Sequence, residues 1–268
     1  MPEETQDISC YIGSMNAEKR SRGMNVIPYE KRDGKSVEKS DAVRKMFNSI
    51  ALRYDLMNDI MTGGLHRRWK RLAVKESLGK NKSMALDLAC GTGDLGLIFA
   101  RSGAEKVVCI DFSERMLDVA RMKAKRKALT RRLSFSRTDA LNLPFPDATF
   151  DSVATGFSLR NVDGIAKMFK EVQRVLKPGG RFTVLELARM KSSLTGKIFN
   201  FYFKKIIPPL GGIITGDRAA YDYLPESISN VPGVDELELL LANTGFSNVK
   251  FRLLGWGSVV IISGEKQK

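Results

Sequence analysis

A glycine-rich turn that follows a short apolar run constrains the fold of this chain more than any other feature. Residues 84–89 read Met-Ala-Leu-Asp-Leu-Ala, and residues 90–96 read Cys-Gly-Thr-Gly-Asp-Leu-Gly. A buried strand that passes through such a turn into a helix is the first half of a unit in which parallel strands are joined by helices. We therefore expect an α/β protein with a ligand site where this turn meets the end of the strand.

The same alternation of strands and helices continues after the turn. Further segments have the composition of buried strands: 107–111, 133–138, 150–157 and 181–187. Ser113 is a suitable N-cap for the helix that follows it, and Asp163 for a helix whose apolar residues share one face. This order of elements predicts a parallel sheet that is covered on both faces.

The C-terminal part departs from the alternation. A final helix is expected over 233–244, after which strands over 249–254 and 258–263 lie too close together for a helical crossover. These two strands should therefore pair as an antiparallel hairpin.

Two additions flank or interrupt the predicted sheet. Residues 1–40 lack apolar periodicity and are expected to form a flexible extension. Helical spacing begins near Asp41 and predicts a helical cap on a domain that covers 41–268. An aromatic insert over 191–229 is expected to cover the substrate.

The composition excludes several classes of protein. No apolar run reaches the roughly 18 residues that a membrane-spanning helix needs, and the N-terminus lacks the apolar core of a secretory signal. Three scattered cysteines without a CxxC pair predict a reducing cytoplasm, no disulfide framework and no metal site. Because His66 is the one histidine, a Ser-His-Asp triad is also disfavoured.

The formal charge of +14 comes from two windows of the sequence. Residues 66–82 have 7 basic and 1 acidic side chains, and residues 115–137 have 9 and 1, so excesses of +6 and +8 account for the whole charge. Such windows suit nucleic acid or an anionic lipid surface, although a solvated helix face has the same composition.

The acids around the glycine-rich turn favour a cationic ligand over a dinucleotide. The turn matches the GxGxxG pattern, and Asp111 follows Gly91 by 20 residues, which is also the spacing of nicotinamide-binding folds. However, Asp87 lies within the strand, and Asp94 stands at the helix N-terminus where a pyrophosphate would bind. These acids predict S-adenosylmethionine as the cofactor, with NAD as the second choice and an ordinary tight turn as the structural alternative.

Further residues are expected to complete the cofactor site. Asp111 should accept hydrogen bonds from the ribose hydroxyls, Asp139 from the adenine amino group, and the Ala140 amide should meet the ring. The full predicted set is Asp87, Gly91, Thr92, Gly93, Asp111, Phe112, Asp139, Ala140 and Gly156.

Several longer motifs narrow the interpretation to one family. They are Asp-Leu-Ala-Cys-Gly-Thr-Gly at 87–93, Phe-Asn-Ser-Ile-Ala-Leu-Arg-Tyr-Asp-Leu-Met-Asn-Asp at 47–59, Gly-Leu-His-Arg-Arg-Trp-Lys at 64–70, Leu-Arg-Asn-Val at 159–162, Arg-Val-Leu-Lys-Pro-Gly-Gly-Arg at 174–181 and Tyr-Leu-Pro-Glu-Ser-Ile at 223–228. With these motifs the chain resembles the ubiquinone/menaquinone biosynthesis C-methyltransferases over about residues 44–266. The resemblance implies a Rossmann-like, seven-stranded class I methyltransferase sheet. It also implies methylation of a polyprenylated quinol, either demethylmenaquinol to menaquinol or a 2-methoxy-6-polyprenyl-benzoquinol in ubiquinone synthesis.

The resemblance suggests which residues act on the quinol. We expect Arg160 to stabilise a phenolate or orient a water, Asn161 to position the same oxygen, and Tyr54 and Asp55 to complete a proton path. Three of these residues have a structural alternative: a surface ion pair for Arg160, a helix cap for Asn161 and core packing for Tyr54. His66 is expected to pack or cap rather than act as a base.

The remaining expectations concern partners and competing functions. The insert would form an apolar mouth for the isoprenoid tail, and the basic windows would hold the enzyme on the inner, anionic face of the membrane. A homodimer is allowed. An RNA methyltransferase is disfavoured because the segment after the fourth strand reads Thr-Gly-Phe-Ser rather than an Asn/Asp-Pro-Pro-Tyr/Phe motif. A non-catalytic lipid- or nucleic-acid-binding module is a further alternative.

Overall fold

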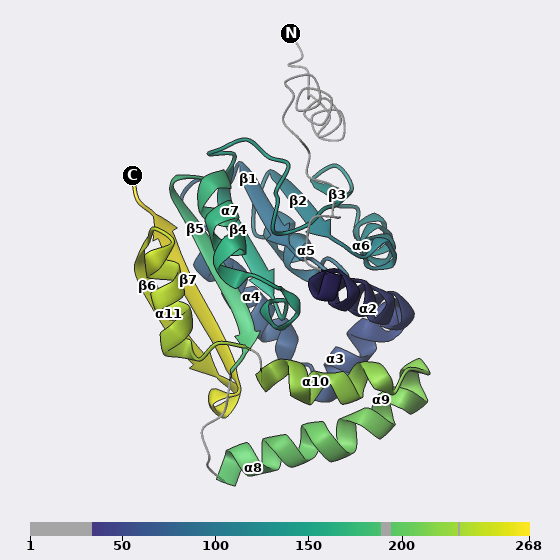
Figure 1. The fold of residues 1–268 in the computed structure, drawn as a ribbon. Coiled ribbons are helices and arrows are strands. Elements are labelled where there is room, and N and C mark those ends of the chain that lie inside the picture. The colour runs from purple at the N-terminus through teal and green to yellow at the C-terminus, as the bar shows by residue number, and fades with distance from the viewer. Residues whose placement is uncertain (1–33, 189–193, 230) are drawn as a thin grey trace.

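A seven-stranded sheet forms the centre of the computed structural model, which describes residues 34–188, 194–229 and 231–268 (Figure 1). The strand order is β3-β2-β1-β4-β5-β7-β6, and β7 runs antiparallel to both of its neighbours. The strands are β1 Met84–Leu88, β2 Lys106–Asp111, β3 Leu133–Arg137, β4 Phe150–Gly156, β5 Leu176–Leu187, β6 Phe246–Leu254 and β7 Val259–Lys266. The predicted α/β sheet with an antiparallel C-terminal hairpin is therefore confirmed.

Helices cover both faces of the sheet, as expected for strands that are buried on both sides. One face is covered by α4 Leu65–Ser77, α5 Asp94–Arg101 and α6 Glu114–Arg126, and the other by α7 Ile165–Val175 and α11 Val234–Asn243. Two short turns, η3 Leu159–Asn161 and η5 Gly255–Gly257, follow β4 and β6. Each face thus has its own apolar core.

Local signals placed most element ends closely, although β6 begins before the predicted residue 249 and β7 ends after residue 263. Ser113 caps α6 as predicted, because its Oγ accepts a hydrogen bond from Met116 N at 3.2 Å. The helix that Asp163 was predicted to cap begins one residue later, since Gly164 is the N-cap of α7. The Pro-Gly-Gly segment, which was read as a break before a strand at 181, lies inside β5 and accompanies a shift in its pairing with β4.

A group of helices gathers at the end of the sheet toward which β5 points (Figure 1). The cap comprises α2 Gly34–Ile50, η2 Ala51–Arg53 and α3 Tyr54–Thr62. The insert comprises α8 Leu194–Phe201, the π-helical turn η4 Tyr202–Ile206, α9 Ile207–Thr215 and α10 Ala219–Ser229. Because α2 begins at Gly34, the predicted boundary at residue 40 falls within a helix, while residues 1–33 lie outside the described part.

Cap and insert share one apolar cluster and are joined by polar contacts. Ser49 Oγ donates to Asp217 Oδ2 at 2.5 Å, and Arg53 Nη1 donates to the Ile214 carbonyl at 2.7 Å. The two segments, which are far apart in sequence, therefore form one cover over the sheet end. Among the described helices, none has the length and apolar character needed to cross a bilayer.

Candidate functional site

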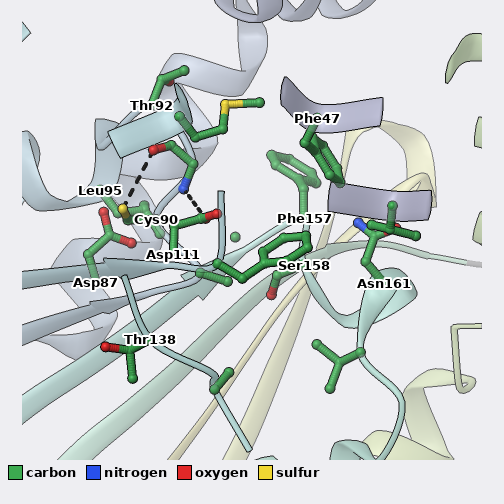
Figure 2. Close-up of a pocket in the computed structure, with 18 of the residues that line it drawn as sticks. Phe47, Asp87, Cys90, Thr92, Leu95, Asp111, Thr138, Phe157, Ser158 and Asn161 are labelled. Carbon is green, nitrogen blue, oxygen red and sulfur yellow. Dashed lines mark hydrogen bonds between the residues drawn. The ribbon is translucent and has the colours of Figure 1, made fainter. Parts of the chain in front are cut away.

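A pocket lies at the carboxyl ends of the central strands, beneath the cap. Two carboxylates hold the glycine-rich turn beside it. Gly91 N donates to Asp111 Oδ2 at 2.7 Å (Figure 2). Gly96 N donates to Asp87 Oδ2 at 2.7 Å. The two predicted acids therefore fix both ends of the turn as well as facing the pocket.

Two of the glycines are required by close packing. Gly96 lies so near β2 that an added Cβ would overlap Cys109 Sγ and come within 3.1 Å of Leu133 Cδ2. Gly93 has a φ of +78°, and a Cβ there would lie 2.9 Å from Ala120 Cβ of α6. Both positions favour glycine for steric reasons. Gly93 faces α6 and does not line the pocket, in contrast to the other predicted cofactor residues.

Eight of the nine predicted cofactor residues line the pocket together. They are Asp87, Gly91, Thr92, Asp111, Phe112, Asp139, Ala140 and Gly156. An added Cβ at Gly91 would meet nothing within 4 Å, so this part of the turn borders open space. The sequence thus located one wall of the pocket almost completely.

Burial dominates the ionisation of the two acids. It raises the pKa of Asp87 to about 8, against the hydrogen bond from Gly96 and the charge of Lys70. It raises the pKa of Asp111 to about 6, against hydrogen bonds from the amides of Ser113 and Gly91. Asp87 Oδ1 is buried and accepts no hydrogen bond from the residues that the structure describes, so the site holds a carboxylate oxygen without a partner among them.

The opposite wall is aromatic and polar. Figure 2 shows Asn161 across the pocket from Asp87 and Asp111, with the rings of Phe47 and Phe157 nearby. Asn161 Oδ1 is buried without a hydrogen-bond partner, which makes it a second polar atom available to a ligand. Phe157 has a φ of +57°, an unfavourable conformation for a residue with a Cβ. Strain of this kind is common beside binding sites.

Tyr54 also lines the pocket, and it packs in the apolar cluster of the cap as well. Its ring lies edge-on to Phe47, with the centroids 6.1 Å apart. The site role and the packing role that the sequence left open for Tyr54 are therefore compatible.

Arg160, which was expected to act on the quinol, does not line the pocket. The side chain is buried behind the pocket wall rather than exposed in it, and its Nη1 donates to Ser227 Oγ of α10 at 2.8 Å. Arg160 Nε has no partner, and the charge of the guanidinium lowers the pKa of Glu186, which burial raises more strongly. Arg160 thus links η3 to the insert, and it is no surface ion pair.

Asp55 also lies outside the pocket, in a cluster of four charged groups. Its Oδ1 accepts from Thr92 Oγ1 at 2.6 Å and its Oδ2 from Lys123 Nζ at 2.6 Å. Asp94 accepts from Lys123 Nζ and, at 2.7 Å, from Lys70 Nζ. Because both Asp55 oxygens are engaged, this carboxylate ties the cap to the glycine-rich turn and is not placed on a proton path.

The cluster changes one argument made from the sequence. Although burial opposes its ionisation, Asp94 has a pKa held well below its ordinary value by Lys70 and Lys123. Its charge is compensated within the protein, so Asp94 does not disfavour a phosphate as the sequence suggested. The case for a cationic ligand rests on Asp87 instead. Sequence reasoning missed both lysines, whose positions in the two basic windows gave no sign that they are internal.

His66 has a structural role, in agreement with the prediction. Its Nε2 lies 2.8 Å from Asp59 Oδ1, the ring is buried, and it does not line the pocket. Burial is the main cause that lowers its pKa. The histidine joins α3 to α4 and takes no part in the pocket.

Comparison with known sequences identifies related proteins. Residues 35–266 match the sequence model of the ubiE/COQ5 methyltransferase family. The chain is 43% identical over 222 residues to a demethylmenaquinone methyltransferase of Thermus thermophilus, covering 82% of this chain and 100% of the relative. It is 39% identical over 246 residues to the ubiquinone/menaquinone biosynthesis C-methyltransferase UbiE of Cellvibrio japonicus, covering 91% and 96%.

Solved structures support the fold at much lower sequence identity. The [4+2]-cyclase SpnF superposes with a TM-score of 0.64 and 19% identity, covering 85% of this chain and 97% of that one. A phosphoethanolamine N-methyltransferase 2 of Haemonchus contortus, solved in complex with S-adenosyl-L-methionine, gives a TM-score of 0.54 and 17% identity, covering 74% and 52%. The sheet is thus the Rossmann-like sheet of class I methyltransferases.

Proposed function

We propose that this chain, which belongs to the ubiE/COQ5 methyltransferase family, transfers a methyl group from S-adenosylmethionine to a ring carbon of demethylmenaquinol. The observation that carries the proposal is the family match over 35–266, combined with a pocket whose two walls suit a cofactor and a quinol. Methylation of a 2-methoxy-6-polyprenyl-benzoquinol is the second candidate, favoured by relatives named for both pathways.

The glycine-rich side of the pocket fits a cationic cofactor. Asp87 Oδ1 is a buried carboxylate oxygen without a partner, and a positive ligand group would satisfy it. Asp111 keeps acceptor capacity for ribose hydroxyls, since each of its oxygens accepts one backbone amide. Asp139 and Ala140 line the region predicted for the adenine ring, where Leu141 N donates to Asp139 Oδ1 at 3.0 Å.

The cofactor, when bound, supplies an electrophilic methyl carbon. The residues of this chain must then make the acceptor carbon nucleophilic and align it. A quinol hydroxyl with a phenol-like pKa near 10 costs about 4 kcal/mol to ionise at neutral pH. Asn161 lines the pocket and is suited to orient the quinol hydroxyl before it ionises, because its unpaired Oδ1 can accept a hydrogen bond from that hydroxyl.

Arg160 supports the same step from behind the wall. A guanidinium remains charged at any physiological pH, so it stabilises a nearby phenolate electrostatically and is a poor proton acceptor. Its bond to Ser227 fixes it against α10 of the insert. We therefore assign Arg160 the role of positioning Asn161 and of stabilising the developing negative charge.

Aromatic side chains keep water from the reacting groups. Phe47 and Tyr54 of the cap line the pocket together with Phe157, and Phe47 also lies edge-on to Phe112. Alignment in such an enclosed site can contribute roughly 7 to 11 kcal/mol to a reaction between two bound groups.

A polyprenylated substrate dissolves in the bilayer, so we also propose that the protein works from the cytoplasm as a peripheral membrane enzyme. The basic windows at 66–82 and 115–137 support attraction to anionic lipid. The purified protein should sediment with anionic vesicles and be released at high salt, and equal sedimentation with neutral vesicles would contradict this attraction.

The reaction is tested with methyl-labelled S-adenosylmethionine. The purified protein is incubated with demethylmenaquinol, with the benzoquinol and with tRNA in separate reactions, and the label is located by chromatography. Label in the naphthoquinol supports the proposal, and label only in the benzoquinol favours the second candidate. Labelled tRNA with unlabelled quinols would overturn both.

The cofactor site is tested separately by calorimetry. Asp111→Ala should abolish measurable binding of S-adenosylmethionine, because it removes the ribose acceptor and releases the Gly91 amide. Asp118→Ala, at an exposed position on α6, serves as the matched control and should bind normally. Unchanged affinity in Asp111→Ala would refute the ribose assignment.

A further inference from the structure

We propose that the outer surface of the cap and insert, formed by η2–α3 and α8–α9, is the docking face by which this protein inserts into an anionic lipid bilayer. The proposal rests on the proposed function, since a bilayer is where a polyprenylated quinol is found. It names a specific surface that the basic windows alone do not specify.

The cap side of the docking face is an exposed apolar row. Leu52, Leu56 and Ile60 are spaced four residues apart and therefore lie along one side of η2–α3. Leu52 is 81% exposed and Leu56 is 51% exposed, whereas Met57, on the other side of the helix, is 1% exposed. The cap thus has a packed inner face and an apolar outer face that nothing in the described structure covers.

The insert has the same two-sided character. Phe203 and Ile207 are buried against the cap and α10, and their spacing of four residues defines the inner face. The exposed apolar side chains of the insert are Ile198, Phe201, Ile206 and Ile213. Ile213 is 82% exposed, so leaving it in water is unfavourable in the absence of an apolar partner.

The two rows lie side by side. Near one end of α3, Tyr202 Oη contacts the Ile60 carbonyl at 3.5 Å, and just before its other end Arg53 Nη1 donates to the Ile214 carbonyl at 2.7 Å. The earlier residue of the cap, Arg53, thus meets the later residue of the insert, Ile214, and the later residue Ile60 meets the earlier residue Tyr202. The two segments therefore run antiparallel. Figure 1 shows α3 and the insert gathered at the same end of the molecule.

The charge around the apolar rows points to anionic lipid as the occupant. Residues 194–215 contain Lys197, Lys204 and Lys205, all exposed, and no acidic residue. The two acids of α3 are paired within the protein, Asp55 with Lys123 and Asp59 with His66 and Arg67. An apolar surface bordered by unneutralised lysines complements a layer of anionic headgroups.

A second copy of the chain is a poorer occupant. A two-fold interface places the same patch on both partners, so it would bring these lysines together without a carboxylate from residues 194–215 to neutralise them. Bilayer docking satisfies both the apolar and the basic side chains.

The docking face also has a direct relation to the pocket. Tyr54 lines the pocket and lies between Leu52 and Leu56 in sequence, so the two sides of η2–α3 face the pocket and the proposed bilayer. A quinol held by its tail in the lipid would therefore need to cross only the cover formed by cap and insert.

The test compares variants of the full-length protein. Leu52→Gln combined with Ile213→Gln removes apolar area from both rows without touching a pocket residue. Leu239→Gln, at a 63% exposed leucine of α11, is the matched control. Binding to phosphatidylcholine vesicles with and without phosphatidylglycerol is measured by sedimentation, and methylation is measured with vesicle-embedded quinol and with a short-tailed, water-soluble quinol.

The double variant should bind anionic vesicles at least about tenfold more weakly than the parent, which corresponds to about 1.4 kcal/mol. It should lose methylation of embedded quinol while retaining methylation of the soluble quinol, and Leu239→Gln should behave as the parent. Undiminished vesicle binding by a folded double variant, or self-association that is lost in it, would overturn the docking face. Absence of methylation of either quinol by the parent would instead refute the proposed function and leave the vesicle result interpretable.

Discussion

The clearest test of the site is the substitution Asp87→Asn. The carboxylate is completely buried, and its pKa is raised from 3.8 to about 8 mainly by that burial. In the unfolded chain the group ionises near 3.8, so between about pH 4 and pH 8 the folded protein binds one more proton than the unfolded chain. The contribution of Asp87 to stability is therefore full below about pH 4 and falls as pH rises toward 8.

The magnitude follows from this shift. At pH 7 the folded group remains protonated while the unfolded one is ionised, and the difference of about three pH units corresponds to about 4 kcal/mol. An asparagine has no such titration, and its side-chain oxygen can still accept the Gly96 amide that Asp87 Oδ2 accepts at 2.7 Å. We expect Asp87→Asn to be more stable than the parent near pH 8 and to lose this advantage toward pH 4.

Chemical denaturation at several pH values between about 5 and 8 measures the effect. Asp118→Asn, at an exposed position where the carboxylate pairs with Arg121, is the control. Its free energy of unfolding should differ from that of the parent by no more than about 0.5 kcal/mol, and this difference should not change with pH. A free-energy difference between Asp87→Asn and the parent that does not change with pH would refute the reasoning.

The same substitution, Asp87→Asn, should weaken the binding of the cofactor. A cationic ligand favours the ionised form of Asp87, so binding to the parent near pH 7 should release close to one proton, and affinity should fall as pH decreases below 8. Calorimetry in buffers of different ionisation enthalpy measures that proton. Asp87→Asn should bind more weakly and release none, and equal proton release by both proteins would contradict the contact between Asp87 and the ligand.

Three further outcomes are expected. Gly96→Ala should destabilise the folded protein by about 1–3 kcal/mol, because the added methyl group overlaps Cys109 Sγ. Thermal unfolding should show that Cys109→Ala partly restores the stability of this variant. Gly79→Ala is the control and should lose no stability, since nothing lies within 4 Å of the added Cβ. Asp55→Ala should release the cap from the turn, and limited proteolysis should find α2–α3 cut faster, whereas unchanged cleavage would argue against the tie. Asn161→Ala should retain cofactor affinity in calorimetry but lower kcat by about 10²-fold or more, and an unchanged kcat would exclude the assigned contact.

The sheet and the cofactor wall could be predicted because their signals are local. The apolar strands, the helix caps and the short link before the final hairpin each depend on a few neighbouring residues. The glycine-rich turn also depends on local geometry, since Gly96 must pack against β2 and Asp111 must follow one strand after Asp87. Patterns of this kind can be recognised in a single sequence.

The charged interior could not be predicted because it depends on how helices pack. Lys70 and Lys123 reach Asp94 from positions 24 residues before it and 29 residues after it. Both belong to basic windows that are otherwise typical of solvated surfaces. Likewise, nothing in the local sequence indicates that η3 turns Arg160 toward Ser227 of the insert, 67 residues away.

These contacts connect the two halves of the site. The tie from Asp55 to Thr92 joins the cap to the cofactor turn, and the bond from Arg160 to Ser227 joins the quinol wall to the insert. The remaining polar atoms, Asp87 Oδ1 and Asn161 Oδ1, are unsatisfied at opposite walls of the same pocket. A native protein tolerates such groups where a ligand completes them, since each is costly while unpaired. The free protein should therefore unfold at a lower denaturant concentration than its cofactor complex, and Asp87→Asn should reduce that difference.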